Sequence, residues 1–282
     1  MIKTILLTGS GGFVGKNLKK YLEREFNILS PRSYELNCVN KTAVEKYFEE
    51  NEIDFIIHCA STGGVRGMQD KDTTLEDNLK MVENLLDAKG KNVRIILFGS
   101  GAMYGKTRPL HKVKEKELGL FTPEDLYGKS KMLIAEMIKN RSDAVCLNIF
   151  ACYGYDEKES RFPTYAIKRN LNHLPIEINQ NVDFDYLFIE DLCKFVRYFV
   201  GKQPKNNIIN VTPTDSIKLS EIANIVNQIS DFKSDIILKN NLLGNEYTGS
   251  NELLLSEISD FQFTSYKLGL EKLYNYIKTN CL

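Results

Sequence analysis

Short apolar runs alternate with amphipathic stretches along the first half of the chain. The apolar runs predict strands at Thr4–Thr8, Asn27–Ser30, Phe55–Ala60, Arg94–Gly99 and Ala144–Ile149. Between them, apolar residues at helical spacing predict helices at Phe13–Arg24, Lys41–Glu50, Thr74–Ala88 and Leu126–Asn140. Because strands that are apolar throughout are buried on both faces, this alternation predicts a doubly wound α/β fold with a parallel sheet.

The second half of the chain has a less regular pattern. It predicts helices at Pro163–Asn172, Glu190–Val200, Leu219–Ser230 and Leu268–Lys278, and strands at Tyr186–Ile189 and Asp235–Leu238. The charged run His111–Glu117 is typical of a solvated loop. We expect a larger domain in residues 1–153, with a strand and helix near 184–200 that return to its sheet. Most of residues 154–282 should form a smaller C-terminal α/β lobe.

A glycine-rich turn, Thr-Gly-Ser-Gly-Gly-Phe-Val-Gly over residues 8–15, separates the first predicted strand from the first helix. Gly9 allows a sharp turn, Gly12 lets a pyrophosphate approach the backbone, and Gly15 lets helix and strand pack closely. The helix N-terminus then offers free N–H groups to the anion. A surface turn can have the same letters, but this setting favours a Rossmann-type dinucleotide site, with the first strand at the sheet centre.

The composition argues against several classes of partner. The 282 residues include 37 Lys and Arg and 37 Asp and Glu, so no net charge favours nucleic acid or an anionic membrane. Six cysteines without a C-x-x-C pair indicate reduced thiols, and three scattered histidines form no metal-binding pattern. No apolar run reaches membrane-spanning length, and the first is too short for a signal peptide. We therefore expect a cytoplasmic protein that binds no metal.

A tyrosine and a lysine are spaced for acid–base chemistry in the segment Tyr127-Gly128-Lys129-Ser130-Lys131. Tyr127 and Lys131 are four residues apart, so they share one face of the helix predicted at Leu126–Asn140. An ammonium beside a phenol stabilises the phenolate, which can then exchange a proton with a carbonyl or alcohol oxygen. The motif alone is common by chance, and it gains weight only from its neighbours along the chain.

Ser100 supplies a further hydroxyl at the end of the strand predicted at Arg94–Gly99. Ligands of open α/β sheets bind at the carboxyl ends of the strands, so Ser100 can hydrogen-bond the reacting oxygen there. An ordinary turn serine is an equally good reading of this residue by itself. The glycine turn, Ser100 and Tyr127 occur in the order that one ligand site at this sheet edge requires.

These segments resemble the extended short-chain dehydrogenase/reductase family, the NAD(P)-dependent epimerases, dehydratases and reductases of nucleotide sugars. The matching segments, which extend over essentially the whole chain, are Thr8–Gly15, His58–Ser61, Asn78, Ser100, Tyr127–Lys131, Asp185–Asp191 and Lys267–Lys278. The resemblance implies a catalytic Ser100, Tyr127 and Lys131, with Lys131 also on the nicotinamide ribose. It also implies a homodimer that pairs through the helices at Thr74–Ala88 and Leu126–Asn140.

The resemblance further implies a cofactor site and a substrate site between the lobes. The implied cofactor-binding residues are Gly9, Gly12, Phe13, Val14, Gly15, Ser30, Arg32, Asn37, Cys38, Cys59, Ala60, Ser61, Tyr127 and Lys131. The implied substrate-binding residues are Ser100, Tyr127 and Arg161. NAD enzymes place an acid after the second strand, whereas Ser30 and Arg32 suit the 2′-phosphate of NADP(H). We expect NADP(H) to be preferred and NAD to remain possible, since Arg32 also reads as an exposed loop charge.

Departures from the family narrow the expected reaction. Gly101 and Ala102 stand where the dehydratases have an Asp-Glu pair, and Ala102 stands where GDP-fucose synthase has an epimerising cysteine. Neither residue can move a proton, so elimination and that epimerisation are disfavoured. A reductase of a nucleotide-linked 4-keto-6-deoxy sugar is the first hypothesis. A 4-epimerase with tightly bound NAD and a non-catalytic dinucleotide sensor are the alternatives.

Two further departures concern the substrate diphosphate. Ala151 replaces a usual asparagine, and Phe184 replaces the arginine that meets the diphosphate in the family. Arg161, Lys168 or Arg169 can supply the missing charge, although each also reads as an ordinary surface cation. A nucleotide-sugar substrate is therefore an expectation that rests on the resemblance.

Overall fold

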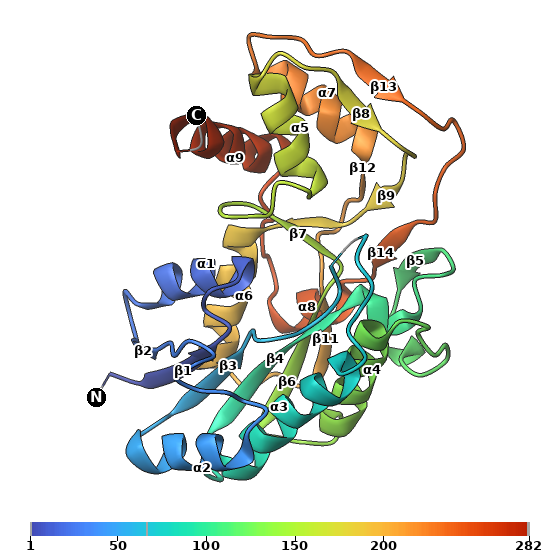
Figure 1. Cartoon of the computed structure of the whole chain (residues 1–282). Helices are drawn as coiled ribbons and strands as arrows, with labels where there is room; N and C mark the ends of the chain where they lie inside the picture. Colours follow the sequence, from blue (N-terminus) through green and yellow to red (C-terminus); the bar gives the residue numbers. More distant parts are fainter. Residues whose placement is uncertain (1, 66, 281–282) are drawn as a thin grey trace.

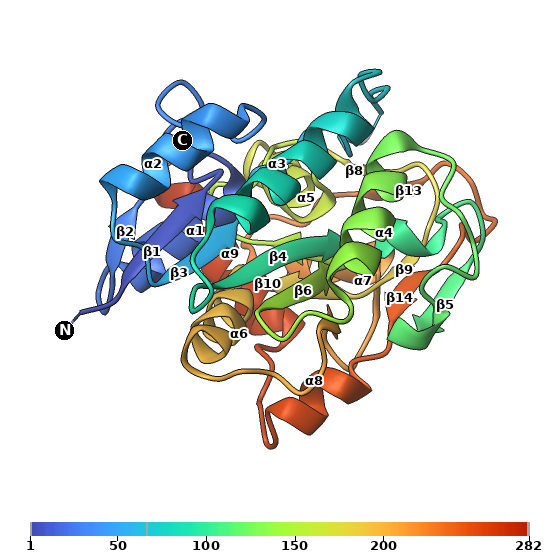
Figure 2. The same cartoon turned by 90° about the horizontal axis from the view of Figure 1, so that it is seen from below.

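The computed structural model describes residues 2–65 and 67–280, which form two lobes (Figure 1). The larger lobe contains a six-stranded parallel sheet in the order β11-β6-β4-β3-β1-β2. Helices α1 and α6 cover one face, and α2, α3 and α4 cover the other (Figure 2). This is the predicted α/β, Rossmann-type doubly wound fold.

The elements of the larger lobe agree with the predicted ranges to within a few residues. They are β1 Thr4–Thr8, α1 Phe13–Leu22, β2 Asn27–Leu29, α2 Lys41–Glu50, β3 Phe55–His58, α3 Thr74–Ala88, β4 Arg94–Ser100, α4 Leu126–Ile138 and β6 Ala144–Ile149. Alternate residues of one strand enter separate apolar cores, since Ile5 and Leu7 pack with one cluster and Leu6 with the other. Each face of the sheet is therefore sealed by its own helices.

Strand β1 does not lie at the sheet centre, as the sequence led us to expect. It is paired with β2 on one side and with β3 on the other, so it is the second strand from the edge. The chain places only β2 beyond β1 before α2 carries it back to β3. The strand order still reverses at β1, and this is the position where a crevice opens in such sheets.

The strand that returns to the main sheet is not the predicted one. Strand β10 (Tyr186–Phe188) pairs with β7 (Ala151–Tyr153) in a separate two-stranded sheet. Helix α6 (Ile189–Gly201) does pack beside α1, and the chain then joins the sheet through β11 (Ile208–Val211). The apolar pattern of β11 is interrupted by Asn210, a fully buried asparagine, which explains why the sequence did not predict this strand.

A small mixed sheet joins segments that are far apart in the chain. It contains β12 (Ile217–Lys218), β9 (Asp183–Phe184), β14 (Tyr247–Gly249) and β5 (Leu110–Val113). The run His111–Glu117, expected as a solvated loop, instead supplies most of β5 and the short 3₁₀ helix η2 (Glu115–Glu117). Lys112 there donates to the fully buried Asp185 at 3.1 Å, so this charge is structural.

The smaller lobe packs three helices together. These are α5 (Phe162–Leu171), α7 (Leu219–Ile229) and α9 (Tyr266–Asn280), and β8 (Ile176–Ile178) pairs with β13 (Ile236–Leu238) beside them (Figure 1). Short elements complete the fold as η1 (Gly101–Tyr104) and α8 (Glu252–Glu257). Within residues 2–65 and 67–280, no helix has the length and apolar character to cross a bilayer, and no three potential metal ligands gather.

Candidate active site

The glycine turn after β1 has the geometry that its sequence predicts. Gly9 has a φ of +69°, and a Cβ on it would lie 2.4 Å from the Ala60 nitrogen, so β1 and β3 meet at this residue. A Cβ on Gly15 would lie 2.3 Å from the Gly9 carbonyl oxygen. Both glycines are therefore required by close backbone contact rather than by flexibility.

Gly12 has a different environment, which fits a bound diphosphate. A Cβ on Gly12 would have only the Gly9 oxygen within contact range, at 3.5 Å. Gly12 is also the N-cap of α1, and no side chain caps this helix or places an acid in its first turn. The first amides of α1 thus point to open space with the positive end of the helix dipole behind them, as a dinucleotide phosphate requires.

Ser30 and Arg32 lie beside the glycine turn, as expected for residues that meet the adenosine ribose. The Ser10 hydroxyl donates to the Ser30 carbonyl oxygen at 3.4 Å. The Arg32 guanidinium lies over Gly11, where a Cβ would be 2.6 Å from Nη1. No acid intervenes between them, and the Glu35 carboxylate accepts from the Arg32 backbone amide at 2.6 Å.

Asn37 and Cys38 lie in the loop that follows. The Asn37 side chain is exposed and accepts from the Val39 amide at 3.1 Å. Cys38 packs into the apolar core under α2 and α3, where burial raises the pKa of its thiol to about 11. Only the backbone of Cys38 can therefore meet a ligand.

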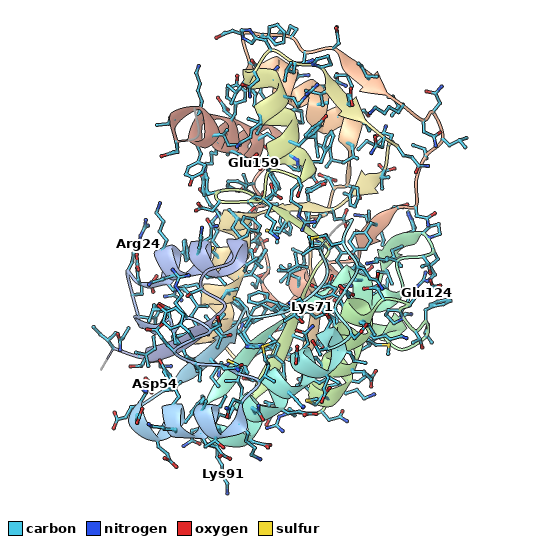
Figure 3. All side chains as sticks on the ribbon, in the orientation of Figure 1. Arg24, Asp54, Lys71, Lys91, Glu124 and Glu159 are labelled. Carbon is cyan, nitrogen blue, oxygen red and sulfur yellow. The ribbon has the colours of Figure 1, made fainter. Side chains whose placement is uncertain are left out.

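A cavity of about 920 Å³ opens where the carboxyl ends of the central strands face the second half of the chain. The predicted site residues that line it are Phe13, Val14, Cys59, Ser61, Ser100, Tyr127, Lys131 and Arg161. The other predicted cofactor residues, Gly9, Gly12, Gly15, Ser30, Arg32, Asn37, Cys38 and Ala60, are not in its lining. Figure 3 marks Glu124, which lines the cavity, and Glu159 in the smaller lobe, with side chains of both lobes between them.

Tyr127 and Lys131 come together on the first turns of α4, as the i to i+4 spacing predicts. The Lys131 ammonium lies 5.4 Å from the centroid of the Tyr127 ring. It donates to the Phe98 carbonyl oxygen at 2.9 Å, and the residue is only 7 % exposed. The cation is therefore held between the end of β4 and the tyrosine, with the cavity beside it.

Ser100 is the last residue of β4 and lines the same cavity. Its hydroxyl oxygen accepts from the Ala102 amide at 3.2 Å, which begins the 3₁₀ turn η1. This turn directs the next side chains, Ala102 and Met103, into buried positions. Ser100 is thus the polar group that β4 offers to a ligand.

Tyr127 is fixed by groups that the sequence did not single out. The Asp70 carboxylate accepts from the Tyr127 amide and from the Gly64 amide, both at 2.8 Å. Gly64 has a φ of +69°, and a Cβ on it would lie 2.9 Å from three atoms of the Tyr127 ring. The loop after β3 therefore packs directly on the phenol.

Asn78 ties the same loop to α4. Its amide group donates to the Ser130 hydroxyl and to the Thr62 carbonyl oxygen, both at 3.0 Å, and its oxygen accepts from the Thr62 amide at 2.9 Å. Ser130 in turn donates to the Tyr127 carbonyl oxygen at 2.7 Å. This buried chain of hydrogen bonds sets the position of the first turn of α4 relative to β3.

His58 is a structural residue at the carboxyl end of β3. Its Nδ1 lies 2.7 Å from the Thr8 hydroxyl, so the pair joins β1 to β3 below the glycine turn. Burial first, and the Lys131 charge second, lower the pKa of His58 to about 3. The imidazole is neutral near pH 7 and carries no charge into the cavity.

Of the three cations considered for the substrate diphosphate, Arg161 lines the main cavity. Lys168 pairs with Glu159, and the Arg169 guanidinium donates to the Pro175 carbonyl oxygen at 2.7 Å. Phe184 also lines the cavity, with its ring 5.9 Å from the Tyr247 ring. An aromatic surface thus occupies the place of the family's arginine.

Glu157, next to Arg161 in space, is a buried carboxyl group. Its side chain is 1 % exposed, and Oε1 lies 3.9 Å from the Arg161 Nε and has no hydrogen-bond partner. Oε2 accepts from the Thr164 hydroxyl at 2.9 Å. Burial raises the pKa of Glu157 from 4.5 to about 8, against the smaller opposing effects of Thr164 and Arg161.

The substitution Glu157→Gln should remove a pH-dependent loss of stability. Between pH 4.5 and about 8 the unfolded chain ionises this carboxyl while the folded chain keeps its proton, so the free energy of unfolding falls as pH rises. The glutamine variant should gain roughly 2–4 kcal/mol over wild type across that window. Urea denaturation at pH 5 and pH 8.5 measures the difference.

Glu159→Gln is the matched control, because Glu159 is exposed and pairs only with Lys168. That variant should follow wild type at both pH values. Parallel pH curves for Glu157→Gln and wild type would show that the Glu157 carboxyl is ionised in the folded protein.

The sequence did not identify Asp70, Phe150, Phe184 and Tyr247 as parts of the cavity wall. The glycine pair Gly63-Gly64, directly after a strand, was the one local signal of a close backbone approach. Asp70 lies in an irregular loop and Tyr247 in a strand of three residues, so neither has a periodic pattern around it.

Together, the doubly wound sheet, the open glycine turn and the serine, tyrosine and lysine on one cavity define a Rossmann-type dinucleotide-dependent enzyme. The family model described as the NAD dependent epimerase/dehydratase family matches residues 5–212. The chain belongs to this family. It is an NAD(P)-dependent enzyme of the extended short-chain dehydrogenase/reductase type, as the sequence motifs predicted.

Relatives of known activity and structure cover nearly the whole chain. A GDP-L-colitose synthase from Yersinia pseudotuberculosis is 27 % identical over 300 residues, which cover 96 % of this chain and 97 % of that protein. A GDP-mannoheptose C4 reductase from Campylobacter jejuni with NADP bound has a TM-score of 0.83, at 20 % identity and 98 % coverage of both chains. A dTDP-4-dehydrorhamnose reductase from Bacillus anthracis with NADP has the same TM-score, at 18 % identity and 98 % coverage of both chains.

Proposed function

We propose that this protein is an NADPH-dependent reductase of a nucleotide-linked 4-keto-6-deoxy sugar. The observation that carries the proposal is that Ser100, Tyr127 and Lys131 line one cavity while Gly101 and Ala102, next to Ser100, offer no group that moves a proton. Such a site can exchange a hydride and a proton at one carbon and lacks the acid–base pair that elimination needs.

In the proposed reaction the Ser100 hydroxyl and the Tyr127 phenol both hydrogen-bond the sugar carbonyl oxygen. When bound, the reduced nicotinamide supplies the hydride that reaches the carbonyl carbon. Tyr127 gives its proton to the oxygen, and the alcohol product forms as Tyr127 becomes a phenolate. Lys131, held by the Phe98 carbonyl, stabilises that phenolate and the ribose hydroxyls until water returns the proton.

The substrate class rests on the relatives and on the cavity wall. The relatives are named as a synthase and reductases of GDP- and dTDP-linked sugars, and this leaves the base open. Arg161 is the proposed partner of the diphosphate, with Phe184 and Tyr247 as apolar surface for the rest of the nucleotide sugar. Residues 1–153, with the segment through β11, would hold the cofactor, and most of residues 154–282 would hold the substrate.

NADP(H) is the proposed cofactor, because Arg32 lies over the glycine turn and no acid is available to grip a ribose 2′-hydroxyl before Glu35. Arg32→Ala should weaken NADPH binding about 10- to 50-fold and NADH binding less than about 3-fold, since only NADPH has the 2′-phosphate. Titrations that follow NADPH and NADH fluorescence measure both constants.

Lys20→Ala is the control for Arg32→Ala, because Lys20 is an exposed cation in the last turn of α1. It should change neither affinity. Equal losses for the two nucleotides in Arg32→Ala would assign Arg32 to general electrostatics and remove the case for NADP(H).

Oxidation of NADPH with GDP- and dTDP-linked 4-keto-6-deoxy sugars, followed at 340 nm, tests the proposed reaction. Stoichiometric formation of the 4-hydroxy sugar supports it. A protein purified with NAD that interconverts 4-epimers without net cofactor use would instead be the 4-epimerase, which the same Ser100 and Tyr127 can serve. A dinucleotide-binding protein without either activity would be a sensor.

The setting of the enzyme is proposed from the same relatives and residues. The cysteines within residues 2–65 and 67–280 are unpaired, in keeping with a reducing cytoplasm. We propose a homodimer that pairs through α3 and α4, which lie side by side on one face of the sheet.

A further inference from the structure

Tyr247 enters the cavity from the far end of the chain. It begins β14 in the small mixed sheet, and its ring packs against Phe150, with centroids 5.5 Å apart, and against Phe184. These aromatic contacts leave its hydroxyl as the polar end of an otherwise apolar wall. The mechanism proposed above does not use this group.

The Tyr247 hydroxyl lies directly over Gly101 and against Ser100. A Cβ on Gly101 would be 2.7 Å from the Tyr247 Oη and 2.6 Å from a Phe150 ring carbon, so any larger residue at 101 would displace the phenol. Burial raises the pKa of Tyr247 well above its ordinary value, and a hydrogen bond with Ser100 opposes this shift. Tyr247 therefore keeps its proton and meets the serine.

A serine hydroxyl has one proton and two lone pairs. The Ala102 amide already donates to one lone pair of Ser100, at 3.2 Å. If the protonated phenol of Tyr247 donates to the other, the Ser100 oxygen is saturated as an acceptor. The Ser100 proton can then point only to an acceptor in the cavity, which is where the carbonyl oxygen must be.

We infer that Tyr247 is a positioning residue that orients the Ser100 hydroxyl as a hydrogen-bond donor toward the substrate carbonyl. The inference rests on the proposed function for the identity of that carbonyl. Tyr247 itself transfers no proton, and its bond to Ser100 is unchanged by the reaction. Gly101, whose lack of a side chain removes the dehydratase acid, is thereby also the residue that admits this hydroxyl.

The test is a double-mutant cycle of Ser100→Ala and Tyr247→Phe, measured on 4-keto sugar reduction. Tyr247→Phe should lower kcat about 10-fold, with the KM for NADPH unchanged, because a freely rotating Ser100 donates for a fraction of the time. In the Ser100→Ala background the second substitution should have almost no effect, because it acts through the serine. Independent, multiplying losses in the double variant would overturn the inference.

Tyr198→Phe is the matched control, since Tyr198 donates to the Glu257 carbonyl oxygen at 2.7 Å and does not line the cavity. It should leave kcat unchanged.

The same cycle on urea unfolding is independent of any substrate. The loss of stability in the double variant should be smaller than the sum of the single losses, and strict additivity would overturn the Ser100–Tyr247 bond. If unfolding is coupled while no 4-keto sugar is reduced, the bond stands and the proposed function fails.

Discussion

Tyr127→Phe is expected to lower kcat by about 10² to 10⁴ while NADPH still binds with nearly its wild-type affinity. The substitution removes one oxygen atom and leaves the ring, so Gly64 and Lys131 keep their contacts with it. The Tyr127 amide also keeps its bond to Asp70. What disappears is the one phenol on this helix face that can give a proton to a substrate oxygen.

Steady-state NADPH oxidation and a separate fluorescence titration of NADPH measure the two quantities. The residual rate should rise toward low pH, where solvent hydronium can replace the phenol as the proton source. Tyr198→Phe again serves as the control, because it deletes a hydrogen-bonded hydroxyl that does not line the cavity. A Tyr127→Phe variant with full kcat would refute the assignment of the proton donor and the proposed mechanism with it.

The glycine turn should separate stability from cofactor binding when its members are changed one at a time. Gly9→Ala is expected to destabilise the protein by roughly 2–4 kcal/mol, because φ is +69° and the new Cβ would meet the Ala60 backbone at 2.4 Å. Gly12→Ala should cost less than about 1 kcal/mol, since φ is −83° and only the Gly9 oxygen approaches, at 3.5 Å.

The same two variants should rank in the opposite way for ligand binding once both are measured in folded protein. The Gly12 methyl group would fill the open space in which the diphosphate must approach α1, so Gly12→Ala should weaken NADPH binding by about 10-fold or more. Urea denaturation followed by circular dichroism gives the stabilities, and NADPH fluorescence gives the affinities. Unchanged NADPH affinity in Gly12→Ala would show that the dinucleotide does not cross the N-terminus of α1.

The local features of this protein were readable from its sequence because each depends on residues close together in the chain. A strand, a glycine turn and a helix follow one another within residues 4–22, and the turn has the predicted close contacts at Gly9 and Gly15. Tyr127 and Lys131 are separated by one helical turn, so helix geometry alone places them together. Apolar periodicity likewise predicted the helices and most strands of the main sheet.

The tertiary structure decided what depends on residues far apart. The order of strands placed β1 second from the edge and brought β11, with its buried Asn210, into the sheet instead of β10. Pairing in the small mixed sheet carried Tyr247 to Gly101, and a loop carboxylate 57 positions away, Asp70, fixed Tyr127.

The cavity thus has two origins. Its catalytic hydroxyls and ammonium lie at strand ends and on a helix that local pattern specifies. Its opposite wall is made by short strands of two to four residues, whose conformation is stabilised by partners rather than by their own propensity. No periodic signal can precede such pairing, because the hydrogen bonds and packing that hold these strands exist only once the distant segments have met.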